Sequence, residues 1–256
     1  MTDRMQANER RLREQPAPLG HARVPFRQCS MHAVCAALSP DEGVSPFVRR
    51  GRLGSGQILF HAGDAFHGVY AVTAGVVKTF ATLRNDQQVV DFFYAGDTVG
   101  LDAVDSGVYT YTARALSETL VCRVDIEQAQ ALGDRYAVFQ SELIRALGEQ
   151  LRHEQSQSIL FRKQNAEQRI ATFLLSLAGA STWNPVRGFD LQLPMARKDI
   201  ANYLGVAVET LCRLFKRMQD DGLIESDGRR VRLLNVPALN ALARPAARRA
   251  DEVCPA

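Results

Sequence analysis

The sequence predicts an α+β protein in three parts: an N-terminal β-roll, a long dimerisation helix and a C-terminal winged helix-turn-helix. Short runs rich in Val, Phe and Tyr, bounded by glycines, occupy residues 47–128 and are typical of an all-β roll or barrel. A helical stretch without proline follows over residues 136–162. Two short helical segments and a hairpin signal then occupy residues 193–234.

The composition is that of a globular protein with room for two domains. Of its 256 residues, 46% are hydrophobic and 23% are charged. No run of about 18 apolar residues could span a membrane, and the N-terminus lacks the apolar segment of a secretory signal. We therefore expect a cytoplasmic protein without a membrane partner. The net charge is only +3, but Lys and Arg concentrate in the C-terminal part, as a surface for phosphate requires.

The roll is expected over residues 29–130, after a flexible arm of residues 1–28 that is polar, Arg-rich and Pro-containing. Individual strands are expected within residues 68–73, 75–81 and 89–94, where glycines bound runs of β-branched and aromatic side chains. Gly-Asp pairs at several corners add turn chemistry.

The dimerisation helix is expected over residues 131–163. Its positions at steps of three and four approximate the seam of a coiled coil: Ile144, Leu147 or Gly148, Leu151, Gln155 and Ser158. A helix of this length between two domains usually buries such a stripe against a twin, so we expect a homodimer. Glu154 lies at or beside the seam, where it would face its symmetry mate and weaken association by charge repulsion. In the alternative interpretation, Glu154 points to solvent.

The C-terminal domain is expected over residues 164–240, followed by a tail of residues 241–256. In its first short helix Ile200 and Leu204 share one face, and Gly205 ends the helix. The next helix carries an apolar stripe for the core: Val208, Leu211, Phe215 and Met218. Its other face carries the candidate DNA-reading residues: Glu209, Cys212, Arg213 and Lys216. A basic Asp-Gly hairpin follows, and the whole pattern is typical of a winged DNA-binding helix-turn-helix.

The succession of roll, long helix and winged helix resembles the CRP/FNR family of bacterial transcription regulators, and within it the oxygen-responsive FNR branch. The most specific segments are Tyr94–Ala103, Asn165–Arg169 and Asp199–Arg213, and the resemblance covers residues 27–240. It implies a cupin-like roll of the cyclic-nucleotide-binding type, a homodimer on double-stranded DNA, and contact with RNA polymerase. It also implies that the protein is not an enzyme.

In FNR-type proteins a Glu-x-x-Ser-Arg motif on the recognition helix reads a TTGAT half-site. By this resemblance Glu209 accepts from a cytosine amino group, and Arg213 reads guanine. Cys212 replaces the serine, and a thiol is a weaker hydrogen-bond partner, so readout of the outer base is expected to relax. Ala207 replaces a threonine and removes a helix cap that contributes about 1 kcal/mol.

The roll departs from the relatives that bind cyclic AMP. The position of their ribose-binding glutamate, after Gly100, is Leu101, and their phosphate-binding Arg-Ser pair falls on Tyr111-Thr112. A buried phosphate would lack a compensating charge at these positions. We therefore expect no cyclic nucleotide.

Five cysteines, an odd number, argue against a disulfide framework. The resemblance implies a [4Fe-4S] cluster, whose usual ligands are matched here by Cys29, Cys35 and Cys122, but the first family position is Phe26. Three interpretations remain. A cluster could use a non-cysteine fourth ligand (His21, His32, an acid of the arm, or water), the thiols could sense redox state or a metal directly, or the cluster has been lost and buried cysteines remain.

Two other classes of function compete with a DNA-binding regulator. A cupin-like enzyme would need convergent metal ligands such as His-x-His on a strand, and the sequence offers no such pair. A small-molecule-binding module acting on protein partners would not need Arg213 or the basic hairpin. In the roll, residues 83–88 correspond to a turn through which relatives touch RNA polymerase, or form an ordinary hairpin tip.

Overall fold

The computed structural model describes residues 48–84, 86–125, 136–179 and 189–244. The chain divides into two compact units, residues 1–151 and 152–256, which are treated separately below. The expected arm, the cysteine segment with Phe26, Cys29 and Cys35, and most of the expected tail lie outside the described residues.

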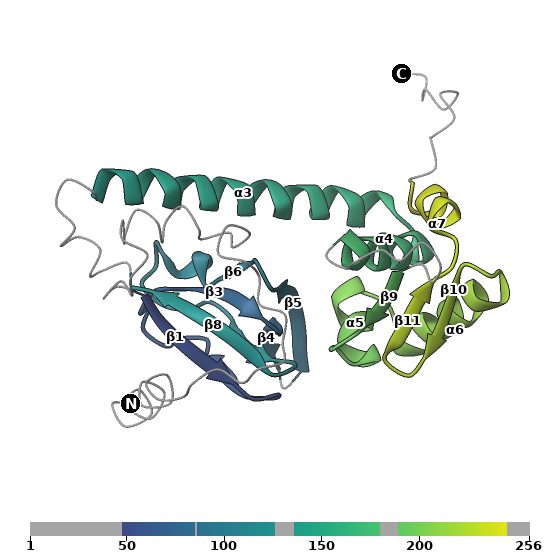
Figure 1. The fold of residues 1–256 in the computed structure, drawn as a ribbon, viewed down its shortest axis with the longest axis horizontal. Coiled ribbons are helices and arrows are strands. Elements are labelled where there is room, and N and C mark those ends of the chain that lie inside the picture. The colour runs from purple at the N-terminus through teal and green to yellow at the C-terminus, as the bar shows by residue number, and fades with distance from the viewer. Residues whose placement is uncertain (1–47, 85, 126–135, 180–188, 245–256) are drawn as a thin grey trace, which may run out of the picture. The chain divides into compact units, whose positions relative to one another are not determined.

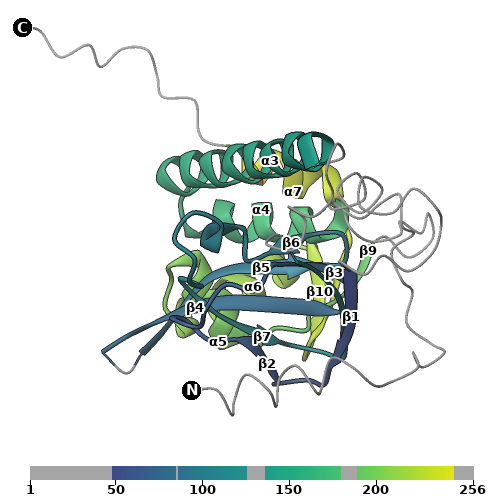
Figure 2. The same cartoon turned by 90° about the vertical axis from the view of Figure 1, so that its left-hand side faces the viewer.

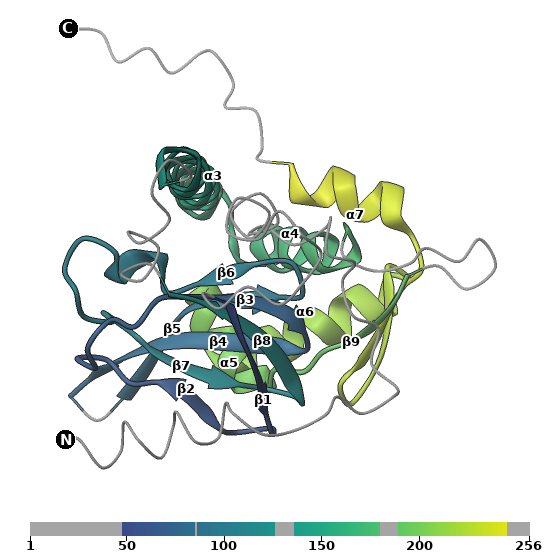
Figure 3. The same cartoon turned by 60° about the vertical axis from the view of Figure 1, so that its left-hand side comes forward.

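The first unit contains two four-stranded antiparallel sheets, with strand orders β1-β8-β3-β6 and β2-β7-β4-β5 (Figures 2 and 3). Their strands are β1 Val48–Leu53, β2 Ile58–Phe60, β3 Val69–Ala74, β4 Val76–Leu83, β5 Asp86–Tyr94, β6 Thr98–Val99, β7 Thr112–Ala115 and β8 Thr119–Val124. A short 3-10 helix, η2, covers Leu101–Ala103. The three strand segments expected from the sequence are confirmed as β3, β4 and β5.

Aromatic rings fill the interior of this roll. Phe60 and Tyr109 stack with ring centroids 3.8 Å apart, and both are buried in the core of the first unit. The Tyr109 hydroxyl donates to the carbonyl of Gly68 at 2.7 Å. Burial raises the pKa of Tyr109 far above its ordinary value, so the phenol stays protonated and keeps this donor. The core therefore consists of packed apolar side chains, and the buried hydroxyl of Tyr109 has a hydrogen-bond partner.

Helix α3, Tyr136–Lys163, presents two different apolar faces in its first half. Phe139 and Leu143 are buried in the roll core, and Leu147 packs against the same core. Ile144 and Leu151 are instead 68% and 58% exposed. Leu147 thus lies on the roll-facing side, because it follows Leu143 by four residues. Ile144 and Leu151, the other aliphatic residues of the expected seam, form a separate exposed stripe.

The second unit is a helical domain with a small sheet (Figures 1 and 3). Its elements are α4 Ala166–Gly179, β9 Phe189–Gln192, α5 Arg197–Leu204, α6 Val208–Asp220, β10 Ile224–Asp227, β11 Arg230–Leu233 and α7 Val236–Ala243. The sheet has the order β10-β11-β9 and is antiparallel. Neither β9 nor α7 was expected, and α7 extends past the expected domain end at residue 240. None of the described helices is long and apolar enough to cross a membrane.

Candidate nucleic-acid interface

Helices α5 and α6 are joined by the tight turn that the sequence predicts. Ile200 and Leu204 are buried on one face of α5, and Gly205 follows with φ 64° and ψ 41°. In this left-handed conformation the Gly205 amide donates to the carbonyl of Asn202 at 3.2 Å. This hydrogen bond satisfies one of the last carbonyls of α5, and the chain turns directly into α6.

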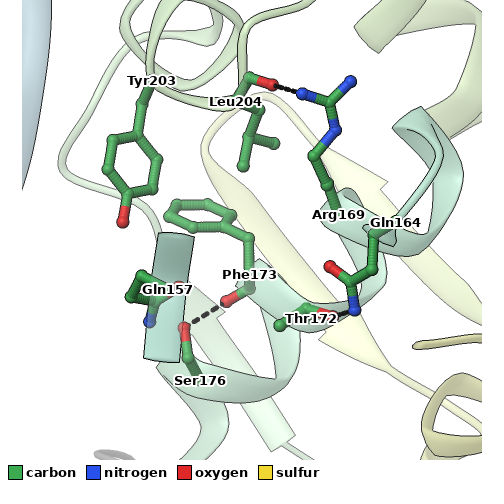
Figure 4. Close-up of a pocket in the computed structure, with 8 residues that line it drawn as sticks. All are labelled: Gln157, Gln164, Arg169, Thr172, Phe173, Ser176, Tyr203 and Leu204. Atoms are coloured by element: carbon green, nitrogen blue, oxygen red, sulfur yellow. Dashed lines mark hydrogen bonds between the residues drawn. The ribbon is translucent and has the colours of Figure 1, made fainter. Parts of the chain in front are cut away.

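A guanidinium from α4 holds the same end of α5. Arg169 donates through Nη1 to the carbonyl of Leu204 at 2.7 Å (Figure 4). Both residues line a small hollow, together with Gln164, whose amide donates to Thr172 at 2.7 Å. The Asn165–Arg169 segment singled out in the sequence therefore fixes the end of α5, since Arg169 caps a carbonyl that the helix leaves open.

Replacing Gly205 with alanine is expected to lower the free energy of unfolding by about 1–2 kcal/mol, because a side chain disfavours the left-handed conformation. The added Cβ would also stand 3.4 Å from Nη1 of Arg169. Denaturant unfolding followed by circular dichroism measures the change. Gly222→Ala is the matched control, because Gly222 has φ 67° but no heavy atom within 4 Å of the added Cβ. A smaller decrease in the free energy of unfolding for Gly205→Ala than for Gly222→Ala would contradict this account of the turn.

Helix α6 buries an apolar stripe of side chains and exposes the opposite, polar face. Leu211, Phe215 and Met218 are buried as expected, but Val208 is 37% exposed and was wrongly assigned to the core. Val208 is the first residue of α6 and lies one turn before the packed stripe begins. Ala207 makes no side-chain cap, as its identity predicts.

The four predicted reading residues are all exposed on α6: Glu209, Cys212, Arg213 and Lys216. Glu209 and Arg213 are four residues apart and therefore neighbours on one helix face. Glu209 lies in the first turn, where the helix dipole favours a carboxylate. The structure thus displays one acceptor and one guanidinium side by side at the start of a rigid helix.

The β10–β11 hairpin, here called the wing (residues 224–233), adds cations beside α6. Its turn passes through Gly228, with φ 54°, and Arg229 is exposed. Arg230 donates through Nε to Asp190 of β9 at 2.8 Å, and this hydrogen bond raises the pKa of the guanidinium. Arg232 donates to Glu225 at 2.6 Å. Two of the three arginines are thus held in place by carboxylates of the same sheet.

In the roll, the positions that would bind a cyclic nucleotide carry neutral side chains. Leu101 is buried, and the Thr112 hydroxyl accepts from the amide of Ala62 at 3.1 Å. A buried cation does occur elsewhere: Arg123 on β8 is 5% exposed and hydrogen bonds to the Tyr70 side chain. Sequence reasoning missed Arg123, since the alternation of a strand does not distinguish a buried arginine from an exposed one.

Cys122 is the one predicted cluster ligand within the described residues. It lies on β8 between Arg50 of β1 and Ala71 of β3, is partly buried, and forms no disulfide. It points to the opposite side of the sheet from Val121 and Arg123, because successive strand residues alternate. Among the residues that the structure describes, no three His, Cys, Asp or Glu side chains gather as a metal site. Cys29 and Cys35 lie outside those residues.

A helix-turn-helix with an exposed acid-and-arginine face, a basic wing and a separate β-roll defines a winged-helix transcription regulator. Comparison with known domains agrees: residues 168–242 match the Crp-like helix-turn-helix domain and residues 50–136 match the cyclic nucleotide-binding domain. The chain belongs to the CRP/FNR family, and its curated relatives place it in the FNR-type branch. It is a DNA-binding transcription regulator and not an enzyme.

Similar proteins cover most of the chain. Transcriptional activator protein FnrA of Stutzerimonas stutzeri is 36% identical over 223 residues, which are 85% of this chain and 91% of FnrA. The fumarate and nitrate reduction regulatory protein of Escherichia coli is 31% identical over 230 residues, which are 88% of this chain and 92% of that protein. Among solved structures, FixK2 of Bradyrhizobium japonicum matches with a TM-score of 0.66 and 26% identity, covering 78% of this chain and 99% of FixK2.

Proposed function

We propose that the protein binds a TTGAT-like palindrome as a homodimer and responds to oxygen or redox state through its cysteines. The observation that carries the proposal is the placement of Glu209 and Arg213 four residues apart on the exposed face of α6. Glutamate accepts from the cytosine amino group and arginine donates two hydrogen bonds to guanine, so the pair suits adjacent base pairs in the major groove. Lys216, one turn further, is placed for a phosphate.

The exposed stripe on α3 supports a homodimer. Ile144 and Leu151 are seven residues apart, and a Cβ added at Gly148 between them would meet no atom within 4 Å. Two exposed aliphatic side chains with an open glycine between them are the pattern that a narrow coiled-coil seam requires. A second copy on this stripe would present two recognition helices to half-sites about 34 Å apart.

For the sensor, Cys29, Cys35 and Cys122 together offer three thiolates, the ligands that iron–sulfur clusters prefer. The resemblance to FNR-type proteins implies a [4Fe-4S] cluster, and the partial burial of Cys122 is compatible with a ligand at the surface of the roll. Because Phe26 cannot ligate iron, the fourth position falls to His21, His32, an acid of the arm or water. When bound, such a cluster supplies sensitivity to oxygen.

A second candidate is a regulator without a cluster that senses redox state by these thiols or senses another small effector. The phenyl ring at position 26 favours it. The iron and sulfide content and the absorbance spectrum of protein purified without oxygen separate the two. About four irons and four sulfides per chain, with visible absorbance, are expected for the cluster. Colourless, iron-free protein that still binds its DNA site would exclude it.

The β4–β5 tip is the proposed contact with RNA polymerase. Leu83 is 62% exposed there, and Arg84 has a positive φ of 48°. An exposed aliphatic side chain at this tip can pack against a protein partner, and its burial there is favourable. Leu83→Ser is expected to reduce transcription from a target promoter in vitro while DNA affinity stays unchanged.

Cys212→Ser is expected to sharpen discrimination at the outer base of the half-site by about 2- to 10-fold, because a hydroxyl makes a stronger hydrogen bond than a thiol. Selection of binding sites from random duplexes measures this. Wild-type protein should enrich TTGAT-like half-sites and accept several bases at the outer position. The variant should accept fewer bases at that position. An enriched motif unrelated to TTGAT would contradict the proposed site.

A further inference from the structure

Arg197, the first residue of α5, connects three elements of the DNA-binding unit. Its guanidinium carbon lies 3.9 Å from the centroid of the Phe215 ring on α6. Its Nη2 donates to Ser226 Oγ on β10 at 2.7 Å and to the carbonyl of Gly228 in the wing turn at 3.2 Å. One side chain therefore touches the first helix of the motif, the recognition helix and the wing.

We propose that Arg197 is a positioning residue for DNA binding, which fixes the wing against the recognition helix through Ser226 and Phe215. The inference rests on the DNA-binding function but not on the TTGAT half-site. Without this link, the wing would be joined to α6 by the short segment after Asp220, by packing and by the long hydrogen bond from Gln219 Nε2 to the Ser226 carbonyl at 3.4 Å. The arginines of the wing and Arg213 on α6 could then no longer engage one duplex as a single rigid surface.

The chemistry of this position requires a guanidinium. A planar cation can stack on an aromatic face and at the same time donate in its own plane, whereas a lysine ammonium is a point charge on a flexible stem. Burial lowers the pKa of Arg197, and the nearby Cys212 opposes that shift.

The contacts of Arg197 predict how the effects of two substitutions on DNA affinity combine. Arg197→Lys keeps the charge but loses the stacked, two-acceptor geometry. Ser226→Ala removes only the Oγ acceptor at 2.7 Å. If Arg197 acts through the wing, the two changes remove the same link and their effects on DNA affinity cannot add.

The test measures DNA affinity by fluorescence anisotropy in a double-mutant cycle. The duplex carries TTGAT-N4-ATCAA, or a site selected by the wild-type protein if that palindrome is not bound. Arg197→Lys is expected to weaken binding about 10-fold and Ser226→Ala about 3-fold, with the double variant no weaker than Arg197→Lys alone. Arg217→Lys is the matched control, because Arg217 is on α6 but lies 3.8 Å from Glu167 of α4. It should change affinity less than 2-fold.

A second measurement needs no DNA. Amide hydrogen exchange in residues 224–233 of the free protein should speed up in both Arg197→Lys and Ser226→Ala, while exchange in α4 stays as in wild type. Wild-type affinity of Arg197→Lys, additive effects of the two changes, or unchanged exchange in the wing would each overturn the proposal. If Arg197→Lys does not fold, the proposal is tested by Ser226→Ala alone, through its DNA affinity and its amide hydrogen exchange in the wing.

Discussion

Arg213→Ala is expected to abolish sequence-specific DNA binding. Each guanine contact by a bidentate arginine contributes about 1–3 kcal/mol of discrimination, or roughly 5- to 150-fold in affinity for each half-site. A homodimer makes this contact twice. Because Arg213 is exposed and lies outside the buried stripe of α6, the variant should fold as the wild-type protein does. Anisotropy titrations with the palindrome and with a scrambled duplex give both affinities.

Replacing the half-site guanine in the DNA distinguishes the loss of a base contact in Arg213→Ala from a general loss of positive charge. Wild-type protein should lose affinity when the half-site guanine is replaced, whereas Arg213→Ala should no longer distinguish the two duplexes. Lys216→Ala is the control, since loss of a phosphate contact weakens binding to all sequences alike. Retained discrimination for guanine in Arg213→Ala would show that another residue reads this base.

Leu151→Glu is expected to dissociate the homodimer and, with it, to remove tight binding to the palindrome. The side chain is 58% exposed in the single chain and would be covered by the second copy. Two carboxylates facing each other in a poorly hydrated seam repel and lose hydration, so the dissociation constant of the dimer should rise by at least about 100-fold. Sedimentation velocity measures the association directly.

Arg145→Glu is the control for this prediction. It places the same carboxylate on the same helix, at a position outside the Ile144–Leu151 stripe, and it disrupts only the weak ion pair with Glu142 at 3.4 Å. It should remain dimeric. If Leu151→Glu dimerised as tightly as wild type, the stripe on α3 would not be the dimer interface.

The long elements could be predicted from the sequence because each has a clear hydrophobic period or is bounded by turn-forming residues. The strand runs at residues 68–94 and the α3 segment are confirmed, and Asn165 and Gln168 form a reciprocal cap at the start of α4. Strand β9 was missed because its four residues follow a polar stretch of sequence and pair with β11, about 40 positions away. Helix α7 did carry a signal, since Asn235 caps it and Pro237 lies in its first turn.

The residues of the candidate site could be predicted where their role depends on spacing within one helix. They could not be predicted where their role depends on contacts distant in the sequence. Glu209 and Arg213 follow from a motif within one helix. Arg169 and Arg197 were not identified as structural links, because their partners lie 35 and about 30 residues away and include backbone carbonyls that carry no sequence signal. Leu147 could not be assigned to one face of α3 without knowing where the roll lies against the first half of that helix.

The most direct test of the central claim is the affinity of protein purified without oxygen for the TTGAT-N4-ATCAA duplex and for a scrambled duplex, measured before and after exposure to air. We predict that the oxygen-free protein prefers the palindrome by at least about 1,000-fold, as specific regulators do. Exposure to air should reduce that preference. Equal affinity for both duplexes in both states would contradict the assignment of an FNR-type reading site to Glu209 and Arg213.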